Sequence, residues 1–254
     1  MRVQVGGEFM FFIFNRPKIY SYLIVLSTVV VLFFTAAVLS EANNMETLTT
    51  SSTVGDTKMP INKVETQEKK IAITINCLEV DKNIEEIIEI LNENSVKATF
   101  CIYGEWVKKY PELTKKISQS GNCIANMSNT YTDMSELSYE EAIKSMEEGE
   151  NKLSTLLNKK IKLFKCPYGK YNENLIKSAQ DKGYTAIGFN IDTLDYQGLE
   201  ANVIWNNIKN RISNGSIISM NSNSENIIEE VKLVVKSLKE REYNIVTVEE
   251  LLNM

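Results

Sequence analysis

The 254-residue chain contains no histidine, so no imidazole is available in it as a general base or as a metal ligand. Its absence excludes the serine–histidine and cysteine–histidine arrangements of nucleophilic enzymes. Positive charge is also in deficit, since 28 lysines and arginines face 33 aspartates and glutamates, for a net charge of -5. Nucleic acid is therefore not predicted as a partner, because phosphate binding needs a basic surface.

An apolar run without charge extends over residues 19–40 (IYSYLIVLSTVVVLFFTAAVLS). It has the length that an α-helix needs to cross a hydrocarbon core of roughly 30 Å. Three basic residues precede it, and none follows until Lys58. The positive-inside rule then predicts a cytoplasmic N-terminus (1–18), a transmembrane anchor (19–40) and an extracytoplasmic remainder in the cell envelope.

A cleaved signal peptide is the alternative interpretation of the same segment. Ala36, Ala37, Ser40 and Ala42 supply small residues near a possible cleavage site. The apolar run is longer than a signal peptide requires, which favours the anchor.

Beyond the apolar run, the composition divides the chain again. Residues 41–70 are rich in Thr, Ser, Asn and charge and poor in aromatic side chains, so they are predicted to form a disordered stalk. Residues 71–254 are long enough for one domain with a sizeable core.

Strand-like and helix-like segments alternate along residues 71–254. Ile71–Asn76 (IAITIN) and Ala98–Tyr103 (ATFCIY) are short runs typical of strands, whereas Ile84–Asn92 (IEEIIEILN) has helical spacing. This alternation predicts an α/β fold with a parallel sheet, open or closed into a barrel, and a site at the carboxyl ends of its strands. Further strands are expected at 123–125, 163–165, 186–190, 216–220 and 244–247, and further helices at 111–120, 139–157, 174–182, 200–213 and 227–240.

Six ordered blocks cover nearly all of residues 69–252. They are KKIAITIN (69–76), VKATFCIYGEWVKKYPEL (96–113), KLFKCPYGKYNENLIKSAQDKGY (162–184), NIDTLDY (190–196), NGSIISMN (214–221) and YNIVTVEELL (243–252). Together these blocks resemble the polysaccharide deacetylase (NodB-homology, carbohydrate esterase) family. The resemblance implies a distorted (β/α) barrel in which a divalent metal, held by an Asp and two His, activates water for attack on an acetyl group.

The residues that carry this reaction in the family are replaced. Asn76 stands at the position of the general base, and Asn221 at that of the histidine acting as general acid. The metal-ligand positions correspond to Cys77, Met127 and Tyr131. The resemblance therefore implies a pseudoenzyme, and no cofactor is predicted; a divalent metal such as zinc would be expected only if the family site were retained.

Two motifs of the family survive in part. Lys165 replaces an arginine, which keeps the positive charge but loses the bidentate guanidinium fork. Asp192 and Asp195 retain the two carboxylates of the fourth motif. The positions equivalent to catalytic residues are thus Asn76, Lys165, Asp192 and Asn221, without a predicted catalytic role.

The fold implied by the resemblance places a ligand pocket at the strand ends. Amides and aromatic rings suit the hydroxyl groups and faces of sugars, which predicts glycan binding; the alternative is unselected change after loss of activity. The pocket is expected to contain Asn76, Cys77, Met127, Asn129, Tyr131, Pro167, Tyr168, Asp192 and Asn221.

The cysteines leave three interpretations open. Outside the cell, Cys77 and Cys166 could form a disulfide across the predicted pocket. With Met127 and Met220 they could instead form a soft-ligand site for Cu(I) or Zn(II). The third interpretation is that they, with Cys101 and Cys123, are inert thiols.

These observations predict a membrane-anchored, extracytoplasmic, non-catalytic polysaccharide-deacetylase-like protein that binds or scaffolds cell-wall polysaccharide or peptidoglycan. Two alternatives remain. One is an active carbohydrate de-acetylase with a rebuilt site around Asp192, Asp195, Lys165 and Tyr168. The other is a structural envelope protein with a protein partner.

Overall fold

The structure is a computed structural model that describes residues 4–5, 8–9, 48–49, 53–54, 57–78 and 82–254. It consists of two units, Met1–Glu46 and Thr47–Met254. The predicted anchor at 19–40 and much of the predicted stalk lie outside the described residues. Within the described residues, no helix combines the length and apolar character needed to span a membrane.

A sheet of eight strands forms the centre of the second unit, and all its pairings are parallel. β7 (Lys70–Asn76) lies between β8 (Thr99–Ile102) and β13 (Ile217–Asn221), and β14 (Asn244–Val246) pairs with its first half. The order is β11-β10-β9-β8-β7-β13-β12. No pairing among the described residues joins β11 to β12, so the predicted parallel sheet is confirmed as a half-barrel. The other strands are β9 (Cys123–Asn126), β10 (Leu163–Lys165), β11 (Thr185–Ile187) and β12 (Ile191–Asp192).

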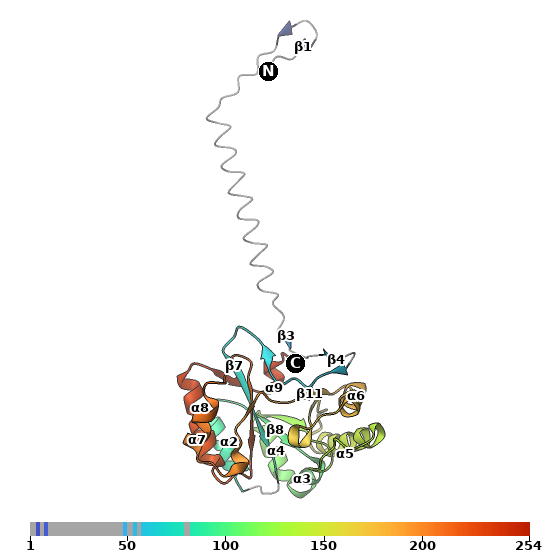
Figure 1. The fold of residues 1–254 in the computed structure, drawn as a ribbon, viewed down its shortest axis with the longest axis vertical. Helices are drawn as coiled ribbons and strands as arrows, with labels where there is room; N and C mark the ends of the chain where they lie inside the picture. The colour runs from blue at the N-terminus through green and yellow to red at the C-terminus, as the bar shows by residue number, and fades with distance from the viewer. Residues whose placement is uncertain (1–3, 6–7, 10–47, 50–52, 55–56, 79–81) are drawn as a thin grey trace. The chain divides into compact units, whose positions relative to one another are not determined.

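Helices cover the outside of this sheet, with α2, α7 and α8 on one side and α3, α5 and α6 on the other (Figure 1). α5 begins at Ser138, whose side chain accepts the Glu141 N–H while Glu141 caps Ser138 in return. The helices are α2 (Ile84–Glu93), α3 (Gly104–Lys109), α4 (Pro111–Gln119), α5 (Tyr139–Leu157), α6 (Glu173–Asp181), α7 (Ala201–Ile208), α8 (Ile227–Glu240), α9 (Val248–Leu251) and the 3₁₀ turns η1 (Pro167–Gly169) and η2 (Asp195–Gln197).

The alternation of side chains along β7 separates the core from the site. Ile71, Ile73 and Ile75 are fully buried in the large apolar cluster that contains residues of α2 and α8. Thr74 and Asn76 point to the other face, because successive side chains of a strand alternate. The strand therefore contributes hydrophobic burial on one face and polar groups on the other.

The segment 59–70 corrects the predicted extent of the disordered stalk. Val64 is fully buried, and its N–H donates to the Gly215 carbonyl at 2.9 Å. Ile61 donates to the Ala186 carbonyl and accepts from the Gly188 N–H, both at 2.9 Å. The polar composition concealed these contacts, because a few apolar residues suffice to dock a short segment. The packed domain thus begins before residue 71.

Short two-residue strands pair antiparallel outside the large sheet. They are β1 (Gln4–Val5) with β2 (Glu8–Phe9), β3 (Leu48–Thr49) with β6 (Val64–Glu65), and β4 (Thr53–Val54) with β5 (Thr57–Lys58).

Replacing Gly215 by alanine should destabilise the domain more than the same change at Gly183. Both glycines have positive φ, 74° and 73°, so both variants carry a left-handed alanine that costs on the order of 1 kcal/mol. A Cβ at Gly215 would lie 1.7 Å from the Val64 carbonyl oxygen, whereas nothing lies within 4 Å at Gly183. We expect Gly215→Ala to lose about 2 kcal/mol more, measured by urea unfolding with tryptophan fluorescence. Equal losses would show that the close approach of Val64 to Gly215 does not constrain the fold.

Candidate functional site

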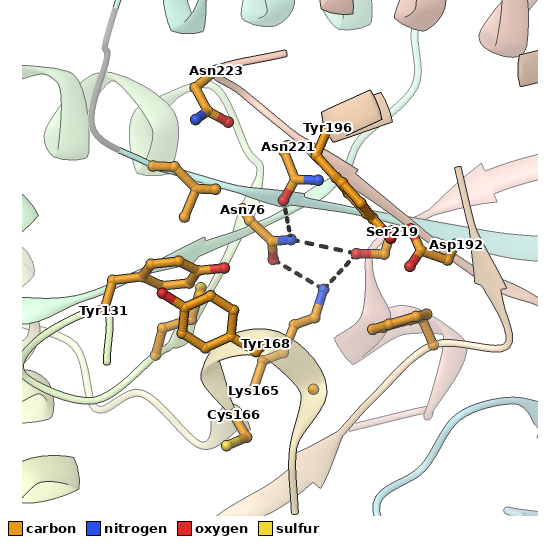
Figure 2. Close-up of a pocket in the computed structure, with 14 residues that line it drawn as sticks. Asn76, Tyr131, Lys165, Cys166, Tyr168, Asp192, Tyr196, Ser219, Asn221 and Asn223 are labelled. Carbon is orange, nitrogen blue, oxygen red and sulfur yellow. Dashed lines mark hydrogen bonds between the residues drawn. The ribbon is translucent and has the colours of Figure 1, made fainter. Parts of the chain in front are cut away.

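A buried lysine organises the carboxyl ends of three strands. Lys165, the last residue of β10, is only 2% exposed. Its ammonium donates to Thr74 Oγ1 at 3.0 Å, Asn76 Oδ1 at 3.0 Å and Ser219 Oγ at 2.9 Å. Figure 2 shows the bonds to Asn76 and Ser219. Three N–H groups meet three neutral acceptors, which satisfies the donors without an ion pair.

Burial lowers the pKa of this ammonium, and the carboxylates of Asp192 and Asp195 act in the opposite direction. No carboxylate of the described residues lies within ion-pair distance of Lys165. The ring of Phe189 lies beside it, with its centroid 5.1 Å from Nζ. The charge is thus held by hydrogen bonds and an aromatic face, with its nearest carboxylates further away.

Two amides extend the network from Lys165 to a buried carboxylate. Asn76 Nδ2 donates to Asn221 Oδ1 at 2.9 Å (Figure 2). The Asn221 backbone N–H and Nδ2 donate to the two carboxyl oxygens of Asp195, at 2.6 and 2.5 Å. Asp195 is fully buried; its burial raises the pKa, while both donors from Asn221 lower it. The order Lys165–Asn76–Asn221–Asp195 forms one continuous hydrogen-bonded chain.

Glu230 on α8 adds a second buried carboxyl group near the hydrogen-bonded series that ends at Asp195. It is 0% exposed, and neither oxygen has a hydrogen-bond partner among the described residues. Burial, with a smaller effect from Asp195, raises its pKa from 4.5 to about 8. The hydroxyl of Thr193 opposes this shift, but it already donates to the Ser219 carbonyl at 3.0 Å. Burial therefore favours the protonated form of Glu230.

A cavity of about 430 Å³ opens above the network. Its rim carries two exposed aromatic side chains, Tyr168 (56%) and Tyr196 (64%). Tyr131 packs against Tyr168 with 4.6 Å between ring centroids, and Tyr168 has a positive φ of 59°. Such a backbone conformation is costly for a tyrosine, which marks the position as constrained. The cavity is lined by Asn76, Leu78, Met127, Tyr131, Lys165, Cys166, Tyr168, Gly169, Phe189, Asp192, Tyr196, Ser219, Asn221 and Asn223.

Comparison with known proteins identifies the family of this fold. The profile described as Polysaccharide deacetylase matches residues 63–187. A CE4 family pseudoenzyme from Bacillus anthracis superposes with a TM-score of 0.73 at 28% identity, over 76% of this chain and 69% of that one. The chain belongs to the polysaccharide deacetylase family.

Two curated relatives of this family are similar over most of the domain. The Bacillus subtilis protein YlxY is 28% identical over 76% of this chain, and a peptidoglycan-N-acetylglucosamine deacetylase of Bacillus cereus is 28% identical over 64%. The matches span 60% and 58% of the lengths of these two relatives. A mutant of the Bacillus anthracis pseudoenzyme with restored enzymatic activity has the same TM-score of 0.73.

The structure brings most of the residues expected in the deacetylase-type pocket together, but not all. Cys77 is fully buried in the large apolar cluster, because it follows Asn76 and so faces away from the cavity. The Asn129 amide bonds to Lys152 and Glu148. Pro167 is buried at the start of η1. The prediction that these three line the pocket is therefore wrong. The other expected residues do line the cavity, namely Asn76, Met127, Tyr131, Tyr168, Asp192 and Asn221.

Several lining residues escaped the sequence-based prediction. Ser219 shares a strand face with Asn221 two residues later, and that alternation could have indicated it. Tyr196 is the last residue of the surviving fourth motif, but it was not assigned to the pocket. Leu78, Gly169, Phe189 and Asn223 carry no comparable signal, whereas Cys166 was expected to border the pocket and does line it.

The side chains at the metal-ligand positions of the family do not fit a divalent cation. Cys77 is buried in the apolar core and faces away from the cavity, so its thiol does not reach a ligand there. Met127 offers only a thioether, and the ring of Tyr131 packs against Tyr168. No group of three or more Cys, Asp or Glu among the described residues is arranged to hold a metal ion.

The cysteine alternatives are also resolved in part. All four thiols are free and buried, so the structure contains no Cys77–Cys166 disulfide. Cys77 and Cys166 belong to different apolar clusters, which disfavours a shared soft-metal site. Burial raises the pKa of each thiol, to about 12 for Cys166, and makes them poor nucleophiles.

The protonated state of Glu230 leads to a stability prediction. A carboxyl whose pKa rises on folding loses its stabilising contribution as pH increases through the folded value. The free energy of unfolding should thus fall by a few kcal/mol between pH 4.5 and about pH 8, the range bounded by the ordinary and folded pKa values. Glu230→Gln should remove much of this fall, whereas Glu229→Gln, at an exposed position of the same helix, should not. Identical pH profiles for both variants in urea unfolding would contradict the assignment.

Proposed function

We propose that this chain is a non-catalytic polysaccharide-deacetylase-like protein that binds cell-wall glycan. The observation that carries the proposal is the hydrogen bond between Asn76 and Asn221. These are the positions that the family resemblance gives to the general base and the general acid. Each holds an amide, and neither amide can take up or release a proton at physiological pH.

The remaining side chains suit recognition of sugar rings. Tyr168 and Tyr196 present exposed aromatic faces at the rim, and Asn223 adds an exposed amide. Aromatic faces pack on the apolar faces of sugars, while amides exchange hydrogen bonds with hydroxyl groups. A cavity that combines aromatic faces and amides can bind a glycan without catalysing a reaction on it.

The relatives support the same function. The structurally similar Bacillus anthracis protein is described as a pseudoenzyme, and the Bacillus cereus relative as a peptidoglycan-N-acetylglucosamine deacetylase. The ligand class proposed for this chain is therefore peptidoglycan or a related N-acetylglucosamine polymer.

An active deacetylase with a rebuilt site is the second candidate, because Asp192 keeps a carboxylate at the cavity wall. The other members of that site argue against it. Asp195 is engaged by two donors from Asn221, and all three N–H groups of Lys165 are engaged by Thr74, Asn76 and Ser219. A structural envelope protein that binds another protein is the third candidate, and it predicts no glycan binding.

We further propose that residues 19–40 anchor the chain in the cell membrane and that the domain lies outside the cytoplasm. The uncharged apolar run and the basic residues that precede it support this arrangement. Residues 41–58 would then act as a stalk.

The full chain should bind peptidoglycan and N-acetyl chito-oligosaccharides without releasing acetate or retaining stoichiometric metal. Tyr196→Ala should weaken binding by about tenfold, since it removes an exposed ring from the rim. The matched control is Val203→Ala, which removes an exposed apolar side chain on α7, outside the cavity lining. Binding is measured by calorimetry, acetate by an enzymatic assay and metal by mass spectrometry.

Acetate release abolished by Asp192→Ala would replace this proposal with the rebuilt enzyme. Absence of glycan binding, together with cross-linking to a membrane protein, would favour the structural role.

The location can be tested with a single introduced thiol. Because the four native cysteines are buried, a membrane-impermeant maleimide should not label the unmodified chain. Lys160→Cys, at an exposed position after α5, should be labelled on intact cells. Labelling only after lysis would place the domain in the cytoplasm and refute the topology.

A further inference from the structure

One carboxylate of the cavity wall has no basic partner. Asp192, at the end of β12, lines the cavity and is half-buried. Its Oδ1 accepts the Leu194 N–H at 3.0 Å, which fixes the side chain in place. No lysine or arginine of the described residues lies within ion-pair distance of it. The carboxylate therefore offers an unpaired negative charge to a ligand.

The other charges around the cavity do not supply that missing cation. The N–H groups of Lys165 are directed at Thr74, Asn76 and Ser219, so the ammonium has no donor left for Asp192. Asp192 and Asp195 both raise the pKa of this ammonium, and two amides connect the ammonium to Asp195 by hydrogen bonds. Burial raises the pKa of Glu230 to about 8 and so favours its protonated form. With one ammonium and the carboxylates of Asp192 and Asp195, the site carries one net negative charge, and Asp192 is the carboxylate that lines the cavity.

Aromatic rings surround the same space. Figure 2 shows Tyr196 and Asp192 on one side of the cavity, with Tyr131 and Tyr168 on the other. The faces of such rings attract cations as well as the apolar faces of sugars. A carboxylate bordered by tyrosines has the chemistry to attract an amine carried on a sugar ring.

We propose that the preferred ligand is a de-N-acetylated amino polysaccharide, a polymer containing glucosamine, whose ammonium group pairs with Asp192 while its rings lie against Tyr168 and Tyr196. The inference rests on the proposed glycan binding and specifies its substrate class. An N-acetylglucosamine unit carries a neutral acetamide at the same position and cannot form the ion pair. The protein then recognises the product that deacetylases of its family make.

The test compares two hexasaccharides of identical backbone, hexa-N-acetyl chitohexaose and fully de-N-acetylated chitohexaose. Binding to the full chain in detergent micelles is measured by calorimetry at neutral pH and low salt. We expect the de-N-acetylated oligomer to bind about tenfold more tightly. Asp192→Asn retains the acceptor for Leu194 N–H and should reduce the ratio of the two affinities to within about twofold of one.

A matched control separates the site from the overall negative charge of the chain. Glu89→Gln changes the net charge equally at an exposed position on α2, and it should leave the ratio unchanged. Equal or tighter binding of the acetylated oligomer would overturn the inference and leave the proposed glycan binding intact. If Asp192→Asn and Glu89→Gln reduced the preference equally, the preference would come from the overall charge of the chain, and the inference would be overturned as well. Binding of neither oligomer would overturn the proposed function itself.

Discussion

The burial of the Lys165 ammonium is the constraint on which the site depends. Removing an ammonium from water costs several kcal/mol unless its donors are satisfied. Thr74 and Asn76 on β7 and Ser219 on β13 supply the three acceptors, so two neighbouring strands must keep the register that pairs Thr74 with Ser219. The half-barrel thereby holds a cation at the centre of its carboxyl edge without a counter-ion in contact.

That arrangement determines the chemistry of the neighbouring positions. A carboxylate at position 76 would form an ion pair with Lys165, whereas the amide accepts one bond from the ammonium and passes another to Asn221. Asn221 in turn donates from its backbone N–H and its side-chain Nδ2 to Asp195. No histidine is present, and burial raises the pKa of Glu230 to about 8, so the pH dependence expected near neutrality is one of stability.

The sequence predicted the elements whose signals are local. The helices at 139–157 and 227–240 have the predicted bounds, since their spacing is regular and α5 has a capping box at its start. The predicted helix at 200–213 ends at Ile208, and the short elements α3, β12 and α9 were not anticipated, because two to six residues carry little periodicity.

Site residues were predicted correctly where a motif position at a strand end specifies the residue. They were predicted wrongly where the direction of the side chain determines whether a residue faces the cavity or the core. Asn76 and Asn221 follow from the motif positions, and both line the cavity. Cys77 was placed by the same alignment, but the alternation of β7 directs it into the core. The docking of Val64 depends on the approach of Gly215, a contact between residues distant in sequence that no local pattern encodes.

The fit among the replaced residues bears on whether the altered site was kept or merely tolerated. Independent loss of catalytic residues would leave partners without hydrogen bonds, and each buried group left so costs about 1–3 kcal/mol. Lys165, Asn76 and Asn221 instead satisfy one another, with donor matched to acceptor at every step. Tyr168 also persists at a positive φ, a conformation that glycine would adopt at lower cost. The hydrogen bonds from Lys165 to Asp195 and the strained, exposed tyrosine above them support the proposed binding surface and favour retention of the altered site over decay.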